Sequence, residues 1–200
     1  MKPAIKKLRH DPVLAGVIDR VGDFRMDYRE PQFESLVRSI ISQQISSKVA
    51  RVFIARLVAR MPEGRITPDN ILRLRVSTFR KMGFSTAKTQ YIRDLARQTA
   101  GGELVFETLP RMSDDEVIEH LTRVKGIGVW TAHMFLMFAL RRPDVLPTGD
   151  LGIRAAIRKE YGLEALPTPA EMHAIAENWR PWCSVACWYL WRSLDGTAAL

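Results

Sequence analysis

Apolar positions along the chain recur at intervals of three and four residues, which is the spacing of one face of an α-helix. No run of alternating apolar and polar residues is long enough to predict a sheet. The sequence therefore predicts an all-helical fold. Helices are predicted from Pro12 to about Gly22, from Pro31 through Ile41, from Ser47 toward Pro62, in a short segment after Pro68, from Ser85 to Gly101, from Ser113 through Leu121, from Val129 to about Leu140, and near Leu151–Tyr161, Pro169–Trp179 and Trp182–Leu194.

Polar residues at the starts of these segments are typical helix caps. Asp11 precedes Pro12 as an N-cap precedes the first helical residue. Ser113 and Glu116 have the spacing of a capping box, in which each side chain bonds the backbone of the other residue. The stretch 77–83 ends in a glycine and is predicted as a brief turn.

Composition sets the size of the fold and the sign of its charge. A chain of 200 residues with 46% hydrophobic residues is large enough for one domain, with two lobes at most. Its 30 Lys and Arg residues outnumber its 22 Asp and Glu residues, and the net charge of +8 is the sign expected of a polyanion binder. The sequence predicts neither a secretory signal nor a membrane-spanning run.

Cysteine usage is sparse. Cys183 and Cys187 lie in one predicted helix, where both are expected to be buried. Two cysteines make neither a disulfide framework nor a four-cysteine iron–sulfur cluster. A cytoplasmic location, associated with the nucleoid if the source is bacterial, is therefore expected.

Two glycines predict a tight reversal between helices, within a helical hairpin that spans about 114–140. These are Gly126 and Gly128. Backbone N–H groups that point outward in such a turn form a nest for a phosphate oxygen, with the Lys125 ammonium and the Thr131 hydroxyl as further contacts. Taken alone, the same glycines more often make a plain connection between two packed helices.

Three stretches taken together are more specific than the glycines. They are the hairpin stretch 121–132, the loop 146–150 with the sequence Leu-Pro-Thr-Gly-Asp, and the closing stretch from Trp179 to Trp191. In order and spacing they resemble the helix-hairpin-helix (HhH-GPD) DNA glycosylase superfamily and, within it, the 3-methyladenine DNA glycosylase II family. The resemblance covers roughly residues 32–195.

The resemblance implies a two-lobed helical domain over residues 1–200. One lobe is expected at roughly 32–142, and the other is built from 1–31 together with 143–200. Because the chain begins with the first predicted helix, the extra β-rich N-terminal domain of larger family members is not expected. The iron–sulfur cluster of another branch of the superfamily is not expected either.

The resemblance places the catalytic aspartate of the family on Asp150. This residue precedes a predicted helix, whose dipole stabilises a carboxylate that can face the positive charge built on the sugar when an N-glycosidic bond breaks. The two base-pocket tryptophans fall on Trp130 and Trp191, whose ring faces attract a cationic base. Met134 and Leu151 stand where relatives have aromatic residues, which implies a more open pocket. Taken alone, Asp150 would be a structural cap and the tryptophans would be core residues.

The segment 42–46, with the sequence Ser-Gln-Gln-Ile-Ser, resembles the one that fills the gap left by an extruded nucleotide. Gln44 is the candidate wedge, with Gln43 beside it as a second DNA contact; taken alone, both are polar residues at a helix end. In related glycosylases, main-chain carbonyls around the hairpin bind a structural sodium or potassium ion. The corresponding residues are Thr122, Val124 and Ile127, and no other cofactor is expected.

The resemblance implies a base excision repair enzyme, which we expect to be a monomer. Such an enzyme flips alkylated bases, of the 3-methyladenine and 7-methylguanine type, out of double-stranded DNA and hydrolyses their glycosidic bond. Bifunctional members carry a lysine at the position after Val129, whereas this chain has Trp130, so no lyase activity is expected.

Two other interpretations remain open at this point. A non-catalytic scaffold could use the hairpin as a phosphate clamp and bind DNA without releasing a base. A helical protein-interaction module would show no salt-dependent DNA affinity.

Overall fold

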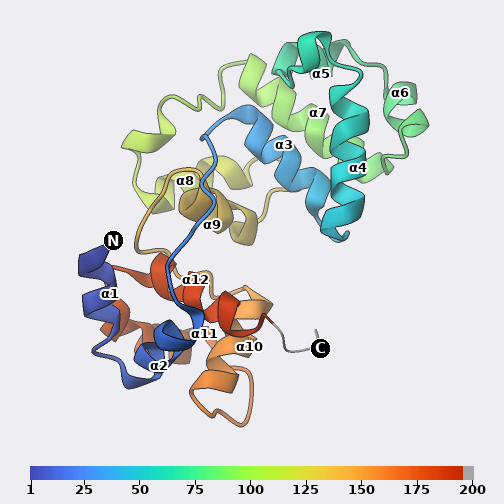
Figure 1. Cartoon of the computed structure of the whole chain (residues 1–200). Coiled ribbons are helices and arrows are strands. Elements are labelled where there is room, and N and C mark those ends of the chain that lie inside the picture. The colour runs from blue at the N-terminus through green and yellow to red at the C-terminus, as the bar shows by residue number, and fades with distance from the viewer. Residues whose placement is uncertain (196–200) are drawn as a thin grey trace. The chain divides into compact units, whose positions relative to one another are not determined.

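The computed structural model describes residues 1–195, and these contain helices, turns and loops but no strand. The all-helical prediction is therefore confirmed for this part of the chain (Figure 1). In chain order the elements are α1 (Lys2–Leu8), α2 (Pro12–Val21), α3 (Phe33–Ser42), α4 (Ser47–Val58), η1 (Pro62–Gly64), α5 (Pro68–Arg73), α6 (Val76–Lys81), α7 (Thr86–Ala100), η2 (Leu109–Arg111), α8 (Asp114–Thr122), α9 (Val129–Phe138), α10 (Leu151–Glu160), α11 (Pro169–Ala176), η3 (Glu177–Trp179) and α12 (Cys183–Ser193), where η marks a 3-10 helix.

The chain folds as two compact units. Unit 1 joins Met1–Tyr28 to the segment that starts at Arg141, and unit 2 is the continuous segment Arg29–Leu140. Unit 1 therefore holds α1, α2 and α10 to α12, while unit 2 holds α3 to α9.

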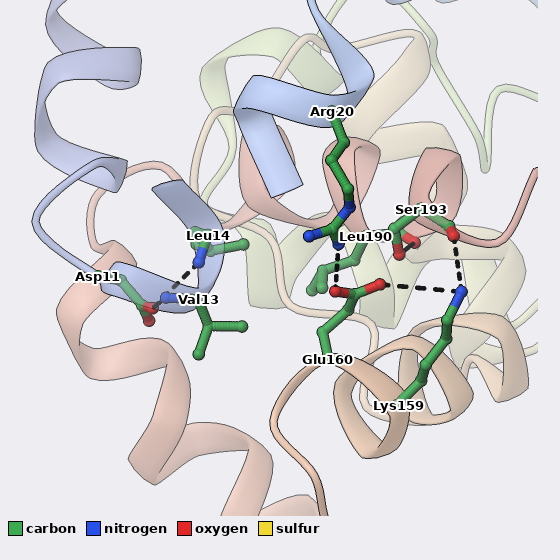
Figure 2. A network of polar contacts seen from close by, with 8 residues as sticks. All are labelled: Asp11, Val13, Leu14, Arg20, Lys159, Glu160, Leu190 and Ser193. Carbon is green, nitrogen blue, oxygen red and sulfur yellow. Dashed lines mark hydrogen bonds and ion pairs between the residues drawn. The ribbon is translucent and has the colours of Figure 1, made fainter. Parts of the chain in front are cut away.

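In unit 1, α2 and α10 both pack against α12. The α2 face toward the core buries apolar residues at helical spacing, namely Leu14, Val17 and Ile18. Figure 2 shows a polar network that joins the same three helices. The Glu160 carboxylate pairs with Arg20 from α2, and Lys159 donates a hydrogen bond of 3.1 Å to the Ser193 carbonyl of α12.

In unit 2, α7 packs against both α3 and α5, and α4 packs against α3. Helix α7 begins where Ser85 accepts a hydrogen bond from the Lys88 N–H, and it buries Ile92, Leu95 and Ala96. Helices α8 and α9 pack against each other as the predicted hairpin. The long α7 thus packs against helices from two other parts of this unit, α3 and α5.

Local signals predicted most helix ends correctly. Asp11 caps α2, and Ser113 and Glu116 form the expected capping box of α8. Two short helices were not predicted: α1 near the N-terminus, and α6, which occupies most of the stretch 77–83 that was interpreted as a turn. Each is too short to show a helical period, so burial of Leu8 and Phe79 rather than local pattern accounts for them.

Cys183 and Cys187 are both buried and unpaired by disulfide, as expected. Within residues 1–195, no helix combines the length and the apolar character needed to cross a membrane.

Candidate active site and nucleic-acid interface

Asp150 is the N-cap of α10 in unit 1, as the sequence predicted. Its Oδ1 accepts a hydrogen bond of 2.7 Å from the Ile153 N–H. Its own N–H donates to the Pro147 carbonyl at 2.9 Å, which fixes the backbone before the helix. The side chain is only 8% exposed, so the carboxylate is held at a defined place at the start of α10.

Trp191 reaches the same carboxylate from α12. Its indole N–H donates a hydrogen bond of 3.0 Å to Asp150 Oδ1, across 41 positions of sequence. Two donors thus converge on one oxygen and orient the carboxyl group. The sequence suggested Trp191 only as a wall of the base pocket, whereas the structure also makes it a direct partner of the candidate catalytic group.

The close approach of Trp191 depends on Gly152, in the first turn of α10. A Cβ at Gly152 would lie 3.1 Å from Asp150 Oδ1 and 3.2 Å from Trp191 Cδ1, closer than most Cβ contacts. Leu151 beside it is 65% exposed, an unusual fraction for a large apolar residue. Apolar surface therefore borders the aspartate on the side open to solvent.

The hairpin of unit 2 turns at Gly126, whose φ of +83° lies in the left-handed region that favours glycine. A Cβ at this position would also lie 2.2 Å from the ring of Tyr91, a residue of α7. Both the backbone conformation and the packing therefore require glycine at position 126.

The structure corrects the predicted nest of outward-pointing amides in part, because two amides at the turn have partners within the unit. The Lys125 N–H donates to Asp94 Oδ2 at 2.9 Å, and the Ile127 N–H donates to the Val124 carbonyl at 3.0 Å. Both amides are consumed within the unit because the turn closes on itself and on α7. Thr131 is only 3% exposed and its hydroxyl lies 3.5 Å from Gln43 Nε2, so the structure does not offer it to a phosphate.

The start of α9 remains the part of the hairpin best suited to an anion. Its N-cap is Gly128, which is exposed and has no side chain to occupy the first amides of the helix. Lys125 is exposed and lies three residues before Gly128. Trp130 follows, 44% exposed, and Met134 lies one turn further along α9, half-buried.

Gln43 and Gln44 lie between α3 and α4 in the same unit. Gln43 Nε2 donates a hydrogen bond of 2.9 Å to the Gly126 carbonyl, so this side chain faces the hairpin. Gln44 is exposed and has a φ of +57°. The structure therefore separates the two: Gln43 ties the loop to the hairpin, and Gln44 forms the tip.

The candidate cation ligands lie on the same turn as the hairpin glycines. The Val124 carbonyl accepts the Ile127 N–H, and a carbonyl oxygen has a second lone pair that can face a cation. Thr122 ends α8, where helix carbonyls lack intrahelical partners. Among residues 1–195, His, Cys, Asp and Glu side chains form no group of three or more that could hold a metal ion.

Several residues that support the hairpin were missed by sequence interpretation. Lys88, Tyr91 and Asp94 lie along α7 at intervals of three residues and contact the loop and hairpin described above. Polar residues at this spacing also occur on any solvated helix face, so the sequence contains no signal that marks them.

Comparison with known proteins defines the class. The model of the HhH-GPD superfamily of base excision DNA repair proteins matches residues 37–181, most of the chain. The chain therefore belongs to the HhH-GPD superfamily.

Individual relatives narrow the class. DNA-3-methyladenine glycosylase 1 of Schizosaccharomyces pombe is 36% identical over 183 residues, which cover 88% of this chain and 80% of that protein. The solved 3-methyladenine DNA glycosylase of the same yeast, in complex with abasic DNA, matches with a TM-score of 0.87 and 33% identity over 99% of both chains. The DNA-3-methyladenine glycosidase of Bacillus halodurans matches with a TM-score of 0.86 and 34% identity over 98% of this chain and 90% of that one.

The chain thus belongs, within the superfamily, to the 3-methyladenine DNA glycosylases. The family predicted from the residue pattern is confirmed, and so is the helical fold. This membership favours an enzyme over a non-catalytic DNA-binding scaffold or a protein-interaction module.

Proposed function

We propose that this protein excises alkylated bases, of the 3-methyladenine and 7-methylguanine type, from double-stranded DNA. The observation that carries the proposal is the Asp150 carboxylate, held at a helix N-cap by the Ile153 amide and the Trp191 indole in a chain of this family. Within this proposal Asp150 is the catalytic residue.

The reaction requires one carboxylate and one water. The bond between C1′ of deoxyribose and the base nitrogen breaks, and its electron pair leaves with the base. Positive charge then builds on the sugar as an oxocarbenium ion, which the Asp150 carboxylate stabilises across the site. Water adds to C1′ and loses a proton to the carboxylate or to solvent, giving an abasic site and a free base.

An alkylated base suits a site with a single acidic residue. Methylation at adenine N3 or guanine N7 gives the base a positive charge, so it leaves as a neutral molecule without a proton donor. In unit 1 the ring face of Trp191 attracts such a cation, and Leu151 adds apolar surface beside Asp150. Trp130 and Met134 are the further base-pocket candidates, and they lie in unit 2. Leu151 and Trp130 are both substantially exposed, which suits residues that meet a substrate.

Hydrolysis without strand cleavage is part of the proposal. A lyase reaction needs an amine that forms a Schiff base with the sugar, and the position after Val129 is Trp130 instead of lysine. We therefore expect a monofunctional enzyme.

DNA binding is assigned to unit 2. Lys125, Gly126 and Gly128, together with the start of α9, are proposed to hold a phosphate, and a sodium or potassium ion on the carbonyls of Thr122, Val124 and Ile127 would stabilise the turn. Gln44 is proposed to enter the stack, with Gln43 holding its loop. The enzyme is proposed to act as a monomer in the compartment that holds DNA, the cytoplasm, in association with the nucleoid if the source is bacterial.

The experiment is base release from methylated duplex DNA by the full chain, followed by gel analysis before and after alkali. Release of 3-methyladenine or 7-methylguanine, with strand breaks only after alkali, is the expected result. Strand breaks before alkali would contradict the monofunctional proposal. Tight DNA binding without release of any alkylated base would favour the scaffold instead.

A further inference from the structure

The loop that joins α3 to α4 holds its tip in an unfavourable backbone conformation. Gln44 has a φ of +57°, which is uncommon for any residue other than glycine. Such a conformation persists only where the surroundings hold it. The groups that hold this loop therefore decide how Gln44 is presented.

Lys88 of α7 contacts the loop directly. Its Nζ donates hydrogen bonds of 2.5 Å to the Ile41 carbonyl and 2.8 Å to the Gln43 carbonyl. The last carbonyls of a helix lack partners within it, and a cation at that end interacts favourably with the negative end of the helix dipole. Lys88 thus fastens the residue immediately before Gln44 to the end of α3.

The ammonium group of Lys88 is partly desolvated at this position. The side chain is half-buried, and burial lowers the pKa of Lys88 below the usual value for lysine. A lysine that served only solubility or a long-range attraction for DNA would stay in solvent. Two charge-assisted hydrogen bonds to carbonyls offset the desolvation.

The opposite side of the loop is fastened to the hairpin, which α7 also supports. Gln43 Nε2 donates to the Gly126 carbonyl at 2.9 Å, while the Tyr91 ring lies against Gly126 and Asp94 accepts the Lys125 N–H. One side of α7 therefore holds both the loop tip and the hairpin turn. Within this arrangement Lys88 holds the residue that directly precedes the tip.

We infer that Lys88 is a positioning residue that presents Gln44 to the gap in the DNA stack. The inference rests on the proposed function, because it takes Gln44 as the wedge. Lys88 itself does not touch the reacting atoms; it acts through the loop.

The test uses a duplex that contains a tetrahydrofuran abasic analogue opposite 2-aminopurine, whose fluorescence reports stacking. Full-length wild type, Lys88→Met, Gln44→Ala and the double variant are each added to saturation, so that differences in affinity do not enter. Lys81→Met, which removes an exposed lysine of the same unit, is the matched control for charge. Thermal unfolding verifies that each variant is folded.

We expect Lys88→Met and Gln44→Ala to abolish most of the wild-type fluorescence change, and Lys81→Met to retain it. In single-turnover base release, Lys88→Met should be slower by about tenfold, since an ångström of misplacement can cost on the order of a hundredfold. In the Gln44→Ala background, Lys88→Met should have no further effect on either readout.

Two results would overturn the inference: an unchanged fluorescence response in folded Lys88→Met, or an undiminished effect of Lys88→Met in the Gln44→Ala background. Absence of base release by the wild type is a separate outcome. It would remove the proposed function, while the fluorescence comparison would still decide whether Lys88 positions Gln44.

Discussion

Two aspartates in unit 1 have nearly the same local structure. Asp11 caps α2 and Asp150 caps α10, and each is 8% exposed. Each also accepts a hydrogen bond from an indole N–H, Asp11 from Trp179 at 3.1 Å and Asp150 from Trp191 at 3.0 Å. A helix cap with a tryptophan partner is thus used twice.

The surroundings of Asp11 enclose it. Its Oδ1 accepts the N–H groups of Val13 and Leu14 (Figure 2), and its Oδ2 accepts the Tyr161 hydroxyl at 2.6 Å in addition to Trp179. Four donors fill the acceptor capacity of a carboxylate. Burial, together with the neighbouring Asp11, raises the pKa of Tyr161, so this phenol remains a donor. Asp11 therefore joins three segments of the unit and has a structural role.

The tryptophan partner of Asp150 is less buried than the partner of Asp11. Leu151, the neighbour of Asp150, is largely exposed, and Trp191 is half-buried, whereas Trp179 beside Asp11 is fully buried. Gly152 leaves room for the indole at the carboxylate. The comparison teaches that the capping interaction orients a carboxylate at both places, so an oriented carboxylate is not by itself evidence of catalysis.

The largest effect is expected from replacing the two aspartates. Asp150→Asn should slow single-turnover base release by about a hundredfold or more, because removing one group that stabilises transition-state charge costs that much. An asparagine still caps α10, so the free energy of unfolding of Asp150→Asn should change little. Asp11→Asn should instead lower the free energy of unfolding by about 1–3 kcal/mol and leave the rate of the folded enzyme unchanged.

Urea unfolding and base release on the same preparations make this measurement. Equal losses of rate in both variants, after correction for the folded fraction, would mean that Asp150 is only a second structural cap.

A smaller effect is expected from replacing the tryptophan partners. Trp191→Phe keeps a ring face but removes the hydrogen bond to Asp150, and release should slow about tenfold, since a bond to a charged group is worth roughly 1.5–3 kcal/mol. Trp179→Phe should lower stability and spare the rate. The rate of Trp191→Phe would stay at the wild-type value if the indole served only as a stacking surface.

The smallest effect is expected at Gly152. Gly152→Ala should slow release several-fold, because the new Cβ would press on Asp150 Oδ1 and the Trp191 ring. Stability should not fall, since alanine favours a helix by up to about 1 kcal/mol over glycine. The matched control is Gly149→Ala, where a Cβ meets nothing within 4 Å and the rate should be unaffected. Equal rates for both alanine variants would refute the close-packing argument.

Local signals made much of the fold predictable. Caps such as Asp11 and Ser113 mark helix starts through bonds that span two or three residues, and such bonds are visible in sequence. Helix α6 was not predicted, because it has only six residues and is stabilised by the burial of Phe79. Short elements of this kind depend on tertiary packing rather than on their own period.

The candidate site was predictable only in part. Asp150 could be found from its place in a family pattern, and its N-cap position followed from the helix after it. Its bond with Trp191 joins two helices and could not be read from spacing. The amides of the turn were expected to face outward, but the Ile127 N–H bonds the Val124 carbonyl within the turn, which sequence cannot show.

The discontinuity of unit 1 has a consequence for how the enzyme is made. Unit 2 is one continuous segment, whereas α2 must wait for α12, near the other end of the chain, before it can pack. Contacts between segments far apart in sequence form late, because closing the long loop between them costs conformational entropy before the contact can stabilise the fold. During synthesis, the unit assigned to holding DNA can be complete while Asp150 still lacks Trp191. We therefore expect a nascent chain to complete the unit proposed to hold DNA before Asp150 gains its bond with Trp191.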